Sequence, residues 1–126
     1  MSLSQRLFAA GYDVLNWGVE GRLKDYRHQT AGMARGDVLE IGGGTGANLP
    51  FYRDDVHLTV VEPNPHMAKR LLRKAARADR QVNVVHEAGE DLSFPDASFD
   101  SVVTTLVLCM VDDMERVVGE ARRVLR

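Results

Sequence analysis

The sequence predicts a doubly wound α/β domain with a parallel sheet, and three observations support this. After Gly36, short apolar runs alternate with segments of helical periodicity. The runs are apolar at successive positions, as is typical of strands that are buried on both faces of a parallel sheet. A glycine-rich segment follows the first run directly, where such a fold turns from a strand into a helix. The 126 residues of the chain are enough for one domain.

The chain begins with helical periodicity. Between Ser2 and Met33, apolar residues recur at roughly helical spacing. We expect one or two helices there, with a break near Gly18 or Gly21.

Four apolar runs then predict four strands. The first three are short, and the fourth is the longest: Val38–Ile41, Leu58–Val61, Val82–Val85 and Ser101–Val111. Three helices are expected between and after them: Ala47–Tyr52, Asn64–Ala78 and Asp112–Leu125. The second has Pro65 at its first helical position, and the third has an acidic start and a basic end that match the helix dipole.

Composition excludes several classes of protein. Hydrophobic residues make up 44% and charged residues 27%, and the net charge of −2 argues against a dedicated nucleic-acid binder. No apolar stretch approaches the roughly 20 residues of a membrane span. The single cysteine, Cys109, excludes an internal disulfide, and the four histidines show no metal-binding spacing, so we expect no metal site. We expect a cytoplasmic protein without a transmembrane segment.

The glycine-rich segment carries the clearest functional signal. Gly42, Gly44 and Gly46 alternate between a predicted strand and a predicted helix, where free backbone N–H groups can attract a ligand. A sharp turn without a ligand would need fewer glycines. A dinucleotide site of the G-x-G-x-x-G type would have Ala47 in the place of its third glycine, which some such sites accept, so spacing leaves this alternative open. A phosphate P-loop would require a Gly-Lys-Ser/Thr sequence, which is missing.

Two glutamates flank this segment in the sequence. Glu40 lies two residues before the first glycine, and Glu62 lies at the end of the second predicted strand, 20 residues after Gly42. A carboxylate there can accept hydrogen bonds from both hydroxyls of a ribose. The alternative for Glu62 is a charge that stabilises the start of the next helix. We expect Glu62 at an exposed strand tip, where its substitution changes folding little.

These residues together resemble a known family. Glu40-x-Gly42-x-Gly44-x-Gly46 resembles motif I of the class I S-adenosylmethionine-dependent methyltransferases, and residues 86–100 resemble their adenine-binding loop and fourth strand. Residues 104–111 and 120–125 resemble the segments that follow. The motifs are most similar to those of methyltransferase-like thiol methyltransferases and of ubiquinone/menaquinone or phospholipid methyltransferases.

The resemblance implies an architecture. It implies a Rossmann-like methyltransferase fold with strand order 3-2-1-4, truncated after the fourth strand and its helix, with N-terminal helices. Residues 1–35 would form a helical lid, and residues 36–126 an S-adenosylmethionine-binding domain without the C-terminal strands. The fourth strand would then be an unpaired edge, through which the chain could associate with itself.

The resemblance also implies a function and a site. The expected activity is methyl transfer from S-adenosylmethionine to a small-molecule acceptor, namely a thiol, a quinone precursor or a lipid amine. A nucleotide-dependent oxidoreductase and a non-catalytic cofactor-binding fragment are the alternatives. No catalytic residue is assigned, because the cofactor supplies the electrophile. The residues expected at the cofactor are Tyr12, Glu40, Gly42, Gly43, Gly44, Gly46, Asn48, Glu62, Pro63, Asn64, Gly89, Glu90, Asp91, Thr105 and Leu106.

Overall fold

A sheet of four parallel strands lies at the centre of the part of the protein that the structure describes. The computed structural model describes residues 3–8, 23–105 and 111–126. The strands are β1 (Asp37–Ile41), β2 (His57–Val61), β3 (Asn83–Val85) and β4 (Ser101–Val103). They are hydrogen-bonded in the order β3-β2-β1-β4, and every pair is parallel. The predicted doubly wound topology is therefore confirmed.

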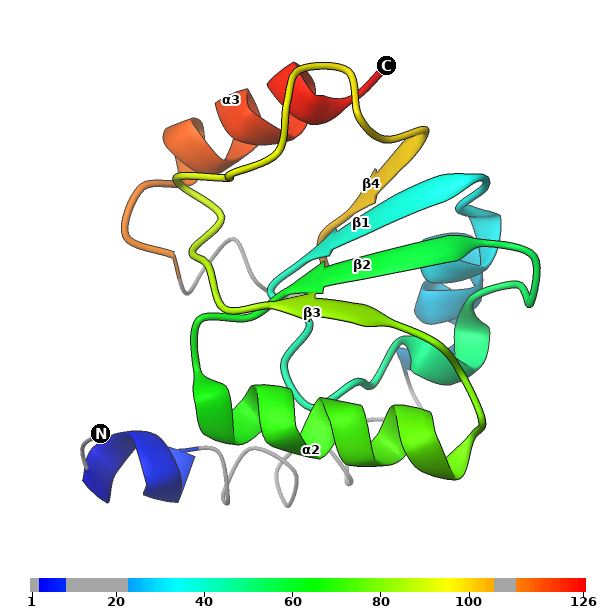
Figure 1. The fold of residues 1–126 in the computed structure, drawn as a ribbon, viewed down its shortest axis with the longest axis vertical. Helices are drawn as coiled ribbons and strands as arrows, with labels where there is room; N and C mark the ends of the chain where they lie inside the picture. Colours follow the sequence, from blue (N-terminus) through cyan, green and yellow to red (C-terminus); the bar gives the residue numbers. More distant parts are fainter. Residues whose placement is uncertain (1–2, 9–22, 106–110) are drawn as a thin grey trace.

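A long helix covers each face of the sheet. Helix α2 (Pro65–Arg77) and helix α3 (Met114–Val124) lie on opposite sides of the strands in Figure 1. The side chain of Asn64 caps α2 by accepting hydrogen bonds from the backbone N–H groups of His66 and Met67, and the side chain of Asp113 caps α3. Both helices match their predicted positions to within two residues at each end.

The core is divided by the sheet into two layers. On the α2 side, Val38, Val60 and Leu71 are buried together, and on the α3 side Leu39 and Val117 belong to a second cluster. Successive residues of β1 thus point to opposite faces, as the pleat of a strand requires.

Two segments differ from the sequence-based expectation. The helix predicted at residues 47–52 is a single 3-10 turn, Leu49–Phe51. Gly46 has a φ of 90°, outside the helical region, and Pro50 disfavours the α conformation in the residue before it, so a short turn is favoured here over a regular helix. The predicted strand 101–111 pairs with β1 over Ser101–Val103 alone among the described residues. The self-association predicted for this edge stays a prediction.

The N-terminal part is described in two pieces. Residues 3–8 and 23–29 are helical, and a 3-10 turn, Ala31–Met33, leads into β1. The expected break near Gly18 or Gly21 lies outside the described residues, and the division into a lid and a domain stays a prediction. None of the helices in the described residues is long and apolar enough to cross a membrane.

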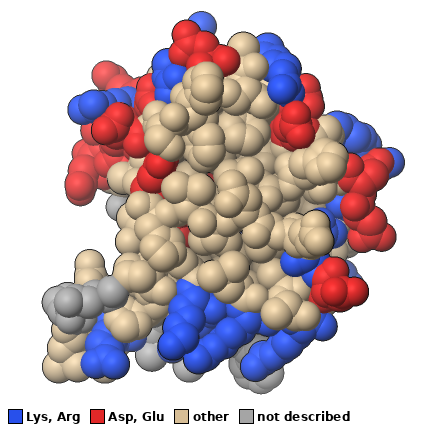
Figure 2. Space-filling model, in the orientation of Figure 1, with Lys and Arg blue, Asp and Glu red and all other residues tan. Residues whose placement is uncertain are grey.

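Charges are unevenly distributed on the face shown in Figure 2. Lys and Arg gather along its lower edge, over α2, whereas Asp and Glu lie mainly on the upper and right-hand parts. Helix α2 contains basic residues but no acidic one, which explains this separation. Further Lys and Arg lie among the acidic residues on the upper and right-hand parts, so the small net charge hides a basic edge over α2.

Candidate functional site

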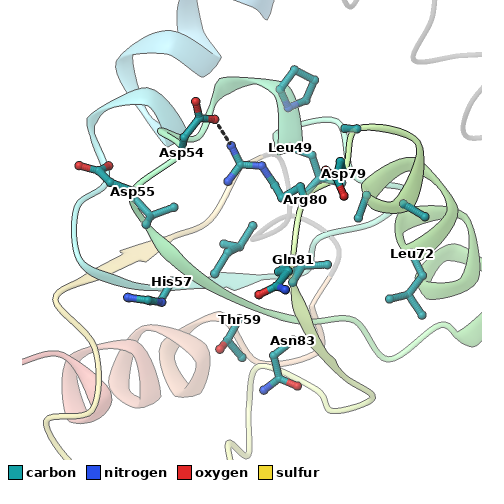
Figure 3. A pocket seen from close by; sticks show the side chains of 17 residues that line it. Leu49, Asp54, Asp55, His57, Thr59, Leu72, Asp79, Arg80, Gln81 and Asn83 are labelled. Atoms are coloured by element: carbon teal, nitrogen blue, oxygen red, sulfur yellow. Dashed lines mark hydrogen bonds and ion pairs between the residues drawn. The ribbon is translucent and has the colours of Figure 1, made fainter.

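Hollows lie at opposite ends of the strands. The larger hollow, of about 1280 Å³, lies where β2 and β3 begin and α2 ends, and Figure 3 shows its lining. An Arg80–Asp54 ion pair of 3.5 Å lies at this hollow. The glycine-rich loop does not contribute to it. Open α/β sheets bind ligands outside the carboxyl ends of their strands, so the larger hollow is at the wrong end for such a site.

The smaller cavity lies at the carboxyl ends of β1 and β2. It has a volume of about 330 Å³, within the range of small-molecule sites. The described residues that line it are Phe8, Ile41, Gly42, Gly44, Glu62, Pro63, Asn64, Met67, Ala88, Gly89, Glu90, Val111 and Asp112.

The glycine loop forms one wall of this cavity. Its first residues extend the sheet, because Gly42 and Gly43 both donate their N–H groups to the carbonyl of Val61, at 2.8 and 3.3 Å. Gly44 has a φ of 57°, a conformation that glycine adopts most readily. Gly43 points into the core instead, because a Cβ there would lie 2.2 Å from Cγ1 of Val60. The loop thus needs glycine at position 43 for packing against the core and at position 44 for its turn.

Glu62 ties this loop to the start of α2. Its Oε1 atom accepts the N–H of Gly44 at 2.9 Å, and its Oε2 atom accepts the N–H of Asn64 at 2.7 Å. Burial raises the pKa of Glu62, and the two backbone hydrogen bonds oppose that rise. The residue is only 6% exposed, so the expectation of an exposed strand tip was wrong. The carboxylate of Glu62 is buried because it accepts backbone N–H groups from two turns, the glycine loop and the start of α2.

The opposite wall comes from the loop after β3. Gly89 is buried, and a Cβ there would lie 2.6 Å from Cγ2 of Ile41, so a larger residue would collide with the core. Helix α3 holds the next part of this loop. Glu120 accepts the N–H of Leu92 at 2.8 Å, and Arg123 donates to the carbonyls of Leu92 and Phe94 at 3.0 and 2.8 Å. The ion pair with Arg123 lowers the pKa of Glu120 to about 2.

A second group of polar side chains lies buried below the loop. We call it the buried polar cluster, and its members are Arg27, Glu40, Asn48, Tyr52 and Thr105. Tyr52 donates its hydroxyl to Oε1 of Glu40 at 2.6 Å. Burial raises the pKa of Glu40 to about 7, although Tyr52, Asn48 and the charge of Arg27 lower it. Burial and the neighbouring carboxylate raise the pKa of Tyr52 further, so its hydroxyl stays protonated and can donate.

The structure separates the predicted site residues into three groups. Those that line the cavity are Gly42, Gly44, Glu62, Pro63, Asn64, Gly89 and Glu90. Those described elsewhere are Glu40, Asn48 and Thr105 in the buried polar cluster, Gly43 and Gly46 packed against core side chains, and Asp91 on the surface. Tyr12 and Leu106 lie outside the described residues. All of these assignments to a cofactor stay predictions.

Sequence reasoning did not assign several lining residues to the site. Phe8, Met67 and Val111 are apolar residues in segments with the pattern of an ordinary helix or strand, and nothing in their spacing marks them. The charge of Asp112 indicates the start of a helix rather than a cavity. No sequence pattern distinguishes Arg27.

The chain matches a known family over most of its length. The methyltransferase domain family matches residues 39–126. Thiol S-methyltransferase TMT1B of Homo sapiens is 41% identical over 118 residues, which are 88% of this chain and 48% of that protein. Phosphatidylethanolamine N-methyltransferase of Cereibacter sphaeroides is 37% identical over 93 residues, which are 72% of this chain and 46% of that protein. The chain thus spans about half the length of these curated relatives.

Solved structures share the fold. A putative S-adenosyl-L-methionine-dependent methyltransferase from Methanococcus maripaludis superposes with a TM-score of 0.78 at 20% identity, covering 94% of this chain and 57% of that one. A SAM-dependent methyltransferase from Thermotoga maritima, a possible histamine N-methyltransferase, gives a TM-score of 0.73 at 28% identity, covering 96% and 56%. The Rossmann-like fold is therefore confirmed.

The family match and the geometry point the same way. The family covers the glycine loop, Glu62 and both walls of the cavity, and gives no support to the oxidoreductase alternative. The resemblance drawn from the sequence motifs is confirmed, and the chain belongs to the methyltransferase domain family.

Proposed function

We propose that this chain forms the cofactor-binding part of an S-adenosylmethionine-dependent methyltransferase. The charge of the cavity carries the proposal. Three carboxylates, those of Glu62, Glu90 and Asp112, lie among the residues that line the cavity, and none of its described lining residues is Lys or Arg. S-adenosylmethionine carries a sulfonium and an ammonium against one carboxylate, so it suits an acidic cavity. The pyrophosphate of a dinucleotide would be repelled there.

The remaining groups fit the other parts of this cofactor. The carboxylate of Glu62 has lone pairs beyond the two that backbone N–H groups occupy, so it can also accept a ribose hydroxyl. Ile41, Met67 and Val111 offer apolar surface to a purine ring, next to the buried Gly89. The cofactor would supply an activated methyl group. The chain's own residues would hold it in place and keep water from it.

We propose a small thiol as the acceptor class. The support comes from the relatives, because the thiol S-methyltransferase named above shows higher identity than the phosphatidylethanolamine N-methyltransferase. Methyl transfer to a thiol is a displacement at carbon by sulfur, in which the cofactor leaves as a neutral thioether. The thiol attacks as a thiolate that has given its proton to bulk water before it enters the site. The protein then has to orient the two sulfur atoms and exclude water, and no acid-base pair of the chain is needed.

Titration calorimetry tests the cofactor, and a transfer assay tests the acceptor. We expect the chain to bind S-adenosylhomocysteine and not NAD; binding of NAD alone would contradict the proposal. Labelled S-adenosylmethionine with a small alkyl thiol should yield a labelled thioether. Transfer to phosphatidylethanolamine vesicles without transfer to the thiol would overturn the acceptor class and leave the cofactor assignment standing.

Glu62→Gln should lower the affinity for S-adenosylhomocysteine about tenfold or more. The amide lacks the charge and one acceptor, so it weakens the bond to the ribose and also the tie to Gly44. Tenfold corresponds to about 1.4 kcal/mol. Calorimetry measures the change, and chemical denaturation measures the accompanying loss of stability.

Glu87→Gln is the matched control. Glu87 also accepts a backbone N–H, that of Ser93 at 3.0 Å, but it does not line the cavity. It should keep the affinity of the wild type. If both variants bind as the wild type does, Glu62 serves the loop and the helix start alone.

A further inference from the structure

The buried polar cluster brings together parts of the chain that are far apart in sequence. Arg27 comes from the helical segment 23–29, Glu40 from β1, Asn48 from the loop after β1, and Thr105 from the segment that follows β4. All four residues are buried, with Arg27 only 2% exposed. Buried charged side chains are uncommon and persist where specific partners satisfy them.

Arg27 and Asn48 form the centre of this cluster. The guanidinium of Arg27 donates to Oδ1 of Asn48 at 2.7 Å and approaches Oγ1 of Thr105 at 3.5 Å. Asn48 donates its own amide to the same Thr105 oxygen at 2.8 Å. The three side chains therefore close a triangle of hydrogen bonds. Each corner belongs to a different segment of the chain.

The cluster is directly connected to the glycine loop. Asn48 lies two residues after Gly46, with one of its bonds to Thr105 and one to Arg27. Oε2 of Glu40 lies 3.5 Å from the position that a Cβ on Gly43 would take, so the carboxylate lies against the underside of the loop. A change in the position of Asn48 or Glu40 would shift the loop that lines the cavity.

We propose that Arg27 is a positioning residue for the cofactor cavity: its guanidinium joins the segment 23–29 to the loop after β1 and to Thr105, and thereby fixes the glycine loop. The proposal rests on the proposed function, since the bound cofactor reports the position of the loop. Arginine suits this role because its guanidinium stays charged and presents several donors in a fixed plane. The N-terminal segment thus contributes to cofactor binding from below the loop.

The proposal predicts the behaviour of two variants at Arg27. Arg27→Met removes the charge and every donor, leaving Oδ1 of Asn48 without this bond, and should lower the affinity for S-adenosylhomocysteine at least tenfold. Arg27→Lys keeps the charge but not the planar group, and should lose less of this affinity than Arg27→Met. Thr105→Val, which removes the shared acceptor while nearly keeping the shape, should also weaken binding; it tests the proposal if Arg27→Met does not fold.

A pH profile separates positioning from a merely structural contribution. Four groups act on Glu40: Tyr52, Asn48 and Arg27 lower its pKa, and Glu62 raises it. Loss of the Arg27 charge should therefore shift the pH midpoint of the Glu40 titration upward in Arg27→Met. Arg27→Lys should restore the midpoint of the wild type. A general loss of packing would affect both variants alike.

Arg80→Met is the matched control. Arg80 is also largely shielded from solvent and donates to a backbone carbonyl, that of Tyr52 at 2.7 Å, but it lies at the larger hollow. The variant Arg80→Met should keep both the wild-type affinity for S-adenosylhomocysteine and the wild-type pH midpoint of Glu40. If Arg27→Met binds as tightly as the wild type, or if Arg80→Met loses as much, the proposal is overturned. A wild-type chain that binds no S-adenosylhomocysteine contradicts the proposed function instead.

Discussion

Gly44→Val should lower the affinity for S-adenosylhomocysteine by about a hundredfold or more, which is ~2.8 kcal/mol. Gly44 has a φ of 57° and lines the cavity. A β-branched residue is strained in that conformation by roughly 1–2 kcal/mol, and its side chain would take up space at the cavity wall. The N–H of Gly44 would also move away from Glu62. Titration calorimetry measures the loss.

Gly119→Val provides the control for this substitution. Gly119 lies in α3, and a Cβ there would meet no atom within 4 Å apart from the backbone of its own helix and its chain neighbours. The same change in side chain should leave affinity unaltered and should not destabilise the helix, since glycine is the poorer helix former. If Gly44→Val bound the cofactor as well as Gly119→Val does, the glycine loop would be a turn without a ligand.

The stability of the protein should fall by up to about 3 kcal/mol between pH 4.5 and pH 7. The reason is Glu40, whose pKa burial raises from 4.5 to about 7. The folded state holds this proton more tightly than the unfolded chain does, at about 1.4 kcal/mol for each tenfold difference in proton affinity. The stabilising contribution is complete below pH 4.5, and it is lost as the pH rises through 7. Chemical denaturation at a series of pH values measures it.

Glu40→Gln should remove most of this dependence. The amide does not titrate, and its oxygen can still accept the hydroxyl of Tyr52. A smaller slope of the same sign should persist, because burial also raises the pKa of Glu62. Glu120→Gln should retain the full decrease, since the pKa of Glu120 is held near 2 and its titration falls below this range. If stability fell equally steeply with pH in the wild type and in Glu40→Gln, the assignment of this pH dependence to Glu40 would be contradicted.

The fold was predictable because its signals are local. Apolar runs such as Leu58–Val61 recur along the chain, and the Asn64–Pro65 pair marks the start of α2. The exceptions have local causes of another kind. Pro50 and the positive φ of Gly46 limit the segment after the glycine loop to one 3-10 turn. The apolar side chain of Leu49 still enters the core that a helix would have filled.

The site was predictable where a backbone turn requires a residue type. Gly44 and Glu62 follow from the turns at the ends of β1 and β2, and both line the cavity. Asn48 and Thr105 show the limit of such reasoning. Their positions in the sequence suggested that they contact the cofactor, but in the structure they form hydrogen bonds with each other and with Arg27. A sequence does not reveal that Asn48 bonds to two residues as distant along the chain as 57 and 21 positions.

The hydrogen bonds between α3 and the loop after β3 have a consequence for the order in which the two walls of the cavity become available. Glu120 and Arg123 bond Leu92 from 28 and 31 residues further along the chain. The residues of the glycine loop and of its glutamate tie, Gly44 and Glu62, are only 18 residues apart and are synthesised before α3. The wall that contains Gly89 gains its support after α3 has been synthesised. During translation, the residues on the β1 and β2 side of the cavity are therefore all present before those that support its opposite wall.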